Sequence, residues 1–302
     1  MKKQLVFFVL ALVLAGGQAM AQKGLKNIIV SQEWLQKHSD DKNLVILHVG
    51  SSKSYDEGHI AGARYIDADD FSREVGKLRW ELPEPEVFKR NLRDRGVNNK
   101  TKIVLVHGGR GHAPTFRLYY TLDYFGLGEN AVILDGGLKG WMANDLPVTT
   151  DIPKNPDASG RLTFKTNASL KVDKDYMKAN SLRDDINVID ARRVNFYEGA
   201  EETRKHYSRS GHIEGAENIC WLDIVDENLF MKDIDTLKAY FEEAGVDKNQ
   251  EVVAYCHVGL RASVIYTVAK GLGYNTRLYD GSYNEWDILD SSYPVKRGRS
   301  GN

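Results

Sequence analysis

Residues 251–273 read EVVAYCHVGLRASVIYTVAKGLG, and they carry the clearest structural signal in the sequence. The run Val252–Tyr255 is short and apolar, which is typical of a buried strand. From Ser263 to Leu272, apolar residues recur with helical spacing on one face, and two glycines follow at the end. Between the two lies a loop that begins at Cys256. The stretch predicts a strand, a loop and a helix, with the cysteine at the carboxyl end of the strand.

The surrounding sequence repeats this alternation. Residues 188–189 predict another buried strand, and residues 236–244, which precede Gly245, predict another helix. Strands that alternate with helices indicate an α/β fold, with a mostly parallel sheet flanked by helices. Such folds bind their ligands at the carboxyl ends of the strands, where Cys256 is expected.

An internal repeat indicates two such domains. The string GHIAGA at 58–63 recurs as GHIEGA at 211–216. Three further pairs of segments follow the same order: 44–48 with 187–190, 102–107 with 251–256, and 134–141 with 279–286. Four matches in one order predict a duplicated domain.

The segment between the two copies is polar and contains two prolines and a glycine, which is typical of a linker. We therefore expect a first domain at 22–150, a linker at 151–165 and a second domain at 166–302.

The N-terminus has the layout of a secretory signal peptide. A basic start (Met1-Lys2-Lys3) precedes an apolar run at 5–15, and Ala19-Met20-Ala21 fits a cleavage site. The run is short for a membrane span, although an uncleaved anchor is the alternative. We expect residues 1–21 to be removed, leaving a periplasmic or secreted protein without membrane attachment.

Composition excludes several classes of protein. The chain has 302 residues, with 41 basic and 42 acidic side chains, so nothing favours nucleic acid as a partner. Its two cysteines exclude a disulfide framework and a zinc site built on several thiolates. The sequence shows neither a metal-ligand spacing nor a nucleotide fingerprint, so we expect no cofactor and no metal.

The loop at Cys256 has the features of a nucleophilic site. Backbone N–H groups and the start of the next helix would stabilise a thiolate or a bound anion. Arg261 adds a positive charge, His257 can add another, and Gly259 allows a tight turn. A buried structural cysteine is the alternative.

These residues resemble the rhodanese family of sulfurtransferases. Residues 25–295 resemble two tandem rhodanese-like domains, with 211–216, 256–261 and 280–286 similar to the family's signatures. The resemblance implies that Cys256 takes up a sulfane sulfur as a persulfide and passes it to a thiophilic acceptor. It also implies a catalytically silent first domain, since His107 stands where the cysteine would be.

The resemblance leaves the donor open. Rhodanese-like phosphatases have five residues between Cys and Arg, whereas this chain has four between Cys256 and Arg261. The shorter loop favours a sulfurtransferase over a phosphatase. The loop CHVGLRAS resembles neither the CRKGVT type of thiosulfate enzymes nor the CGSGVT type of mercaptopyruvate enzymes. We expect a small anionic donor, with thiosulfate favoured over 3-mercaptopyruvate, and cyanide, a thiol or a protein as acceptor. A non-enzymatic sulfur carrier is the alternative from another class.

Beyond Cys256 and Arg261 as catalytic residues, the candidate substrate-binding residues are His257, Val258, Gly259, Leu260, Arg192, Arg204 and Lys205.

Several of these residues have a second interpretation. Arg192 either faces the donor or, as we favour, pairs with Asp190 and braces the loop. Phe196 stands where related tandem proteins have a second Arg. Arg204 and Lys205 either replace that Arg or are ordinary solvated charges.

Three features outside the loop receive structural interpretations. His59 and His212 recur in both copies, which favours hydrogen bonding in a turn over catalysis. We interpret Cys220 as a small apolar core residue rather than a resolving cysteine. The glycine-rich loop at 107–112 reads as a decayed catalytic loop.

Overall fold

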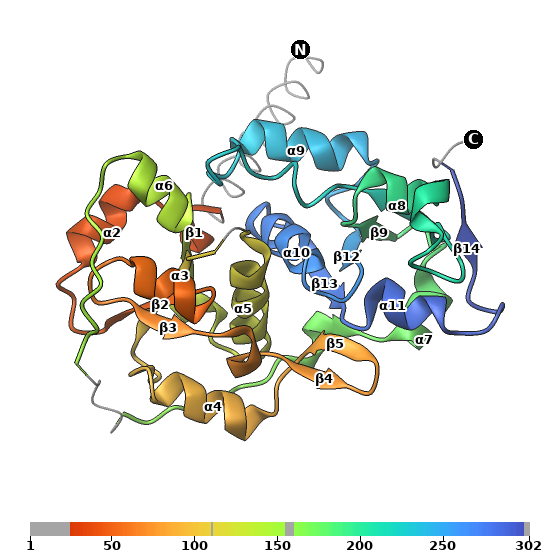
Figure 1. Ribbon diagram of the computed structural model, residues 1–302. Coiled ribbons are helices and arrows are strands. Elements are labelled where there is room, and N and C mark those ends of the chain that lie inside the picture. Colours follow the sequence, from red (N-terminus) through yellow and green to blue (C-terminus); the bar gives the residue numbers. More distant parts are fainter. Residues whose placement is uncertain (1–24, 110, 155–159, 299–302) are drawn as a thin grey trace, which may run out of the picture.

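The computed structural model describes residues 25–109, 111–154 and 160–298, and the predicted signal peptide lies outside them. Two five-stranded parallel sheets form the centres of two α/β units (Figure 1). The first sheet has the order β1-β7-β6-β2-β3 and the second β11-β9-β12-β13-β8. Read in the opposite direction, the second order matches the first strand for strand. The predicted α/β class and the duplication are confirmed.

The strands of the first sheet are β1 (Ile29–Val30), β2 (Leu44–Val49), β3 (Arg64–Ile66), β6 (Lys102–His107) and β7 (Ala131–Leu134). Those of the second are β8 (Lys171–Val172), β9 (Ile186–Asp190), β11 (Ala216–Asn218), β12 (Glu251–Tyr255) and β13 (Asn275–Tyr279). Two small antiparallel pairs lie outside the sheets: β4 (Arg73–Val75) with β5 (Leu78–Glu81), and β10 (His212–Ile213) with β14 (Val295–Lys296).

Helices flank both sheets. In the first unit they are α2 (Gln32–His38), α3 (Ser52–Glu57), α4 (Pro85–Arg93), α5 (Ala113–Tyr124) and α6 (Gly137–Ala143). In the second they are α7 (Lys174–Asn180), α8 (Val194–Glu198), α9 (Ile234–Glu243), α10 (Ala262–Gly271) and α11 (Ser282–Asp287). The helix predicted at 263–272 is α10, shifted by one residue. The helix predicted at 236–244 is α9, which begins earlier because Asp233 caps it by accepting from the Thr236 amide.

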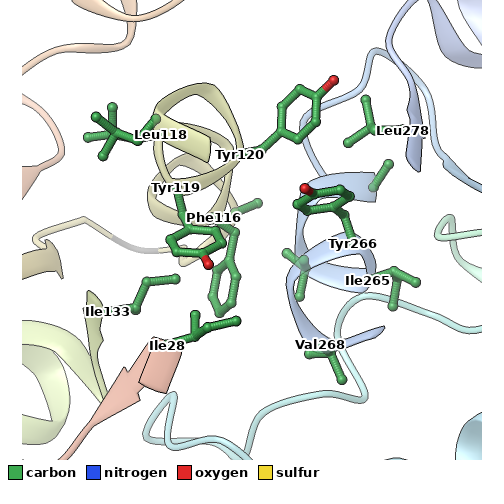
Figure 2. Close-up of a cluster of buried hydrophobic side chains, with 14 of the residues drawn as sticks. Ile28, Phe116, Leu118, Tyr119, Tyr120, Ile133, Ile265, Tyr266, Val268 and Leu278 are labelled. Carbon is green, nitrogen blue, oxygen red and sulfur yellow. The ribbon is translucent and has the colours of Figure 1, made fainter. Parts of the chain in front are cut away.

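The two units meet through α5 and α10, whose apolar faces pack together (Figure 2). Tyr120 of α5 meets Tyr266 of α10 edge to face, with ring centroids 5.0 Å apart. Phe116 and Ile265 belong to the same buried cluster, which continues into both sheets. Because one core spans both units, the two are joined by burial of apolar surface and not by the connecting chain alone.

Part of the predicted linker is packed against the first unit. The Lys165 amide donates to the Phe125 carbonyl at 3.1 Å. Phe164 lies against Phe125, with ring centroids 4.7 Å apart, and against Phe88 at 5.7 Å. Residues 155–159 lie outside the described part of the chain. Within the described ranges, no helix is both long and apolar enough to cross a bilayer.

Candidate active site

Cys256 lies directly after β12, the central strand of the second sheet, as the sequence predicted. Its side chain is fully buried. Its amide donates to the Ser282 hydroxyl at 3.2 Å, and that hydroxyl donates to the Tyr279 carbonyl at 2.8 Å. The start of α11 thus fixes the backbone that carries the thiol.

The loop after Cys256 makes a tight turn that leaves its amides free. Gly259 has φ +77°, and a Cβ there would lie 2.8 Å from the Asp280 carbonyl oxygen. No amide from His257 to Arg261 has an acceptor among the described residues. The Ser263 hydroxyl donates to the Leu260 carbonyl at 2.5 Å and ties the loop to α10. Unpaired amides at a helix N-terminus form a site for an anion.

A cavity of about 410 Å³ adjoins this loop. It is lined by Arg193, Phe196, His206, Tyr207, Trp221, His257, Arg261 and Asn284. Most of its wall is aromatic, and Arg193 and Arg261 supply its guanidinium groups. The Arg261 guanidinium carbon lies 5.5 Å from the centre of the Trp221 ring, which orients the charge. The cavity suits a small anion.

His257 does not add the positive charge that its residue type allows. Burial, together with the smaller effect of the Arg192 and Arg261 charges, lowers the pKa of His257 to about 2. The ring stands perpendicular to Phe196, with centroids 4.7 Å apart, and its Nδ1 shares a hydrogen bond with the Tyr207 hydroxyl. His257 is therefore a neutral wall of the cavity near neutral pH.

The sequence left two roles open for Arg192, contact with the donor or bracing of the loop, and the structure shows the bracing contacts. It is fully buried, and its Nε and Nη2 donate to Asp190 at 2.9 and 2.5 Å. Nη2 also donates to the Gly211 carbonyl at 2.6 Å, and the guanidinium lies over the Tyr283 ring. The side chain does not line the cavity, so its alternative role as a direct donor ligand is not supported by this geometry.

Arg204 and Lys205 are exposed and lie outside the cavity wall, so the structure does not bring them to the site. The basic residue that sequence reasoning missed is Arg193. Its position beside Arg192 could have pointed to it. Neighbouring side chains of an extended segment point to opposite sides, so when Arg192 is buried against Asp190, Arg193 faces the other way. The loop residues Val258, Gly259 and Leu260 follow Cys256 and contribute backbone amides. His206 and Tyr207 lie in the segment before β10, Trp221 follows β11, and Asn284 lies on α11; none of the four gave a local signal.

The paired histidines have the same geometry in both units. His59 Nδ1 donates to the Tyr55 carbonyl at 2.8 Å, and His212 Nδ1 donates to the Tyr197 carbonyl at 2.8 Å. Each ring also stacks on that tyrosine, at 3.8 and 3.9 Å between centroids. The role is structural in both units, but only the His59 bond, to a residue four positions earlier, lies within a turn; the His212 bond joins residues fifteen positions apart.

The first unit has no thiol at the corresponding position. His107 ends β6, is buried, and has a pKa lowered to about 3 by burial and by neighbouring His112. Cys220 is half-buried and lines a different cavity, and burial raises the pKa of its thiol. Across the described ranges, no group of three His, Cys, Asp or Glu side chains could hold a metal ion.

Comparison with known proteins identifies the family. The model of the rhodanese-like domain matches residues 31–144 and again 173–288. The chain is 32% identical over 269 residues to 3-mercaptopyruvate sulfurtransferase of Escherichia coli strain K12, covering 85% of this chain and 94% of that protein. The chain therefore belongs to the rhodanese family, with two rhodanese-like domains.

Other relatives carry different names. The chain is 29% identical to the sulfur carrier protein TtuD of Thermus thermophilus and 29% identical to a putative thiosulfate sulfurtransferase of Haloferax volcanii. Each match covers 90% of this chain and 97% of the relative. The crystal structure of the 3-mercaptopyruvate sulfotransferase SseA from Escherichia coli superposes with a TM-score of 0.72 at 29% identity, covering 84% of this chain and 98% of that one.

Proposed function

We propose that this protein transfers a sulfane sulfur from thiosulfate to cyanide or a thiol through a persulfide on Cys256. It is a sulfurtransferase, as its family and its relatives indicate. The observation that carries the proposal is the position of Cys256 before a loop of unpaired amides, beside a cavity with two guanidinium groups. No other described cysteine lies at the end of a central strand.

The first step forms the persulfide. The Cys256 thiolate attacks the outer sulfur of thiosulfate, a bond forms between the two sulfur atoms, and sulfite leaves with the electron pair of the broken bond. Arg261 draws in the dianion and stabilises the departing sulfite. The amides of residues 257–261 are placed to hold the negative persulfide.

The second step returns the thiolate. Cyanide or a thiolate attacks the outer sulfur of the persulfide, and the sulfur–sulfur bond to Cys256 breaks with its electron pair on the cysteine. The products are thiocyanate or an acceptor persulfide. Because the donor product leaves before the acceptor reacts, the kinetics are expected to be ping-pong.

The charges of the cavity support thiosulfate as the donor. Thiosulfate is a compact dianion, and Arg261 and Arg193 offer it two guanidinium groups. Phe196 gives a longer keto acid no charged anchor for its carboxylate. We expect kcat/KM with cyanide to be higher for thiosulfate than for 3-mercaptopyruvate, measured at steady state on the full chain. A preference for 3-mercaptopyruvate would reverse the assignment of donor.

The same assay separates an enzyme from a sulfur carrier. A carrier would take up sulfur on Cys256 and release it only to a partner protein. Multiple turnovers with thiosulfate and cyanide alone support the enzyme. A single loading event without turnover would support the carrier, whose acceptor would be a protein thiol.

We also propose that the chain is exported. The support is the basic start, the apolar run at 5–15 and the cleavage pattern at 19–21. Protein recovered from the producing cell is expected to begin at Gln22, as N-terminal sequencing or intact mass would report. An exported form that still begins at Met1 would instead indicate an uncleaved anchor.

A further inference from the structure

A side chain of the silent unit reaches beneath the active-site loop of the other unit. Arg117 of α5 donates from Nη1 to Asp280 Oδ1 at 2.6 Å, and both side chains are fully buried. Asp280 follows β13 and stands two residues before Ser282, whose hydroxyl accepts from the Cys256 amide. The ion pair therefore joins the two units at the foot of the catalytic loop.

The loop rests directly on this pair. A Cβ on Gly259 would lie 2.8 Å from the Asp280 carbonyl oxygen, 2.9 Å from Oδ1 and 3.1 Å from Arg117 Nη1. The left-handed turn of Gly259 is thus in close contact with both members of the pair. A change in the position of Asp280 would therefore move the backbone amides on either side of the turn.

The duplication provides an internal comparison. Asp135 is the counterpart of Asp280 in the silent unit, and it accepts from the Met231 amide of the other unit at 2.7 Å. Asp280 likewise accepts from the Leu82 amide of the other unit, at 3.4 Å. Each unit thus uses its aspartate to hold a backbone amide of its neighbour. This cross-unit contact is common to both halves and does not distinguish the catalytic one.

The cations do distinguish the two halves. Asp280 pairs with Arg117 and also with Lys171, 3.2 Å away, whereas Asp135 has no ion pair within the described residues. Counted from the residue that precedes each helix, Arg117 of α5 corresponds to Tyr266 of α10, which donates to Asp123 instead. Among the described residues, only the aspartate of the catalytic half is paired with a cation from the neighbouring unit.

The pKa values of the two aspartates differ as their ion pairs predict: the pKa of Asp135, which has no ion pair among residues that the structure describes, is raised, and that of paired Asp280 is lowered. Burial raises the pKa of Asp135. Burial would also raise the pKa of Asp280, but Arg117 and Lys171 hold it below its usual range.

We propose that Arg117 is a positioning residue for sulfur transfer: the silent unit supplies the guanidinium that fixes Asp280 under the Gly259 turn and so holds the Cys256 loop in its active shape. This inference rests on the proposed role of Cys256. It gives the silent unit a part in the reaction although it carries no nucleophile. Arg117 does not line the cavity and is not assigned a contact with substrate.

The proposal predicts a change in pH dependence. Around Asp280 lie Arg117 and Tyr120 of α5, Lys171 of β8 and Glu81 of β5. With Arg117→Gln, the aspartate loses its nearest cation while the Glu81 carboxyl remains, so its pKa rises. A lowered pKa supports the folded loop at pH values above the ordinary Asp pKa, and that support is lost as the pH falls through the folded value. The acid limit of activity is expected to move up by about one pH unit or more in the variant.

The test compares full-length variants in the thiosulfate–cyanide assay. Arg117→Gln is expected to lower kcat by about ten- to a hundredfold with little change in KM for thiosulfate, because the cavity is intact. Arg117→Lys should restore part of kcat. Asp135→Asn is the matched control from the silent half and should leave kcat and the pH profile near wild type.

The double variant Arg117→Gln/Asp280→Asn keeps the proposal falsifiable if the single variant folds poorly. It replaces a buried charge pair by two neutral amides, so its acid limit should return to the wild-type value. An acid shift that persists in the double variant would overturn the assignment to Asp280. Wild-type kcat and pH profile in folded Arg117→Gln would overturn the positioning role. If the wild type itself transfers no sulfur, the proposed function fails and not this inference alone.

Discussion

Replacement of Cys256 by Ser is expected to abolish sulfur transfer and leave the fold intact. A serine hydroxyl forms no comparable anion near neutral pH, so neither attack on thiosulfate nor a persulfide is available. We expect kcat/KM to fall by more than about a thousandfold. The fold should survive because the Ser282 hydroxyl bonds the amide of residue 256 and not its side chain. Steady-state turnover and a thermal unfolding curve measure the two effects.

Cys220→Ser is the matched control. Cys220 lines a cavity other than the one beside the catalytic loop, and burial raises the pKa of its thiol, which opposes the reactive form. Most of the activity should remain. Mass spectrometry after treatment with thiosulfate should show one added sulfur atom in the wild type and in Cys220→Ser, and none in Cys256→Ser. An active Cys256 variant with an inactive Cys220 variant would contradict the assignment of the nucleophile.

The fold was predictable because its signals are local. The strand before Cys256 and the helix after it are each formed by consecutive residues with a clear apolar pattern. The internal repeat then predicted that the other half of the chain has the same fold. The position of the nucleophile followed, since a loop after a central strand opens at the carboxyl edge of the sheet. The earlier start of α9 came from Asp233, a capping residue that lies before the apolar pattern.

The cavity wall was not predictable, because side chains from separate parts of the chain form it. Trp221 and Asn284 lie far from Cys256 in sequence, and only packing brings them together. The residue type of His257 allowed a positive charge at this position. Its neutral state results from burial between Phe196 and Tyr207, which no local pattern reports. The contact of Arg117 with Asp280 joins the two units and is equally invisible to spacing.

Loss of the His257 charge changes the electrostatic argument for the donor and does not reverse it. The sequence suggested Arg261 and His257 as cations at the sulfur. In the structure Arg193 takes the place of His257 as the second cation, because it lines the cavity and carries a permanent positive charge. Arg193 is exposed, so solvent screens it more than half-buried Arg261. Most of the attraction for a dianion is therefore expected from Arg261.

Arg261→Ala should reduce kcat/KM for thiosulfate by about ten- to a hundredfold, the rate equivalent of one charge-assisted contact of about 1.5–3 kcal/mol. The loss should be smaller for 3-mercaptopyruvate, which carries one carboxylate and a neutral carbonyl. Arg204→Ala is the control, because that guanidinium is exposed and outside the cavity. Arg261→Lys should be intermediate, since an ammonium keeps the charge and loses the planar fork and the stacking on Trp221. Unchanged thiosulfate turnover in Arg261→Ala, or an equal loss for both donors, would show that this charge does not select the dianion.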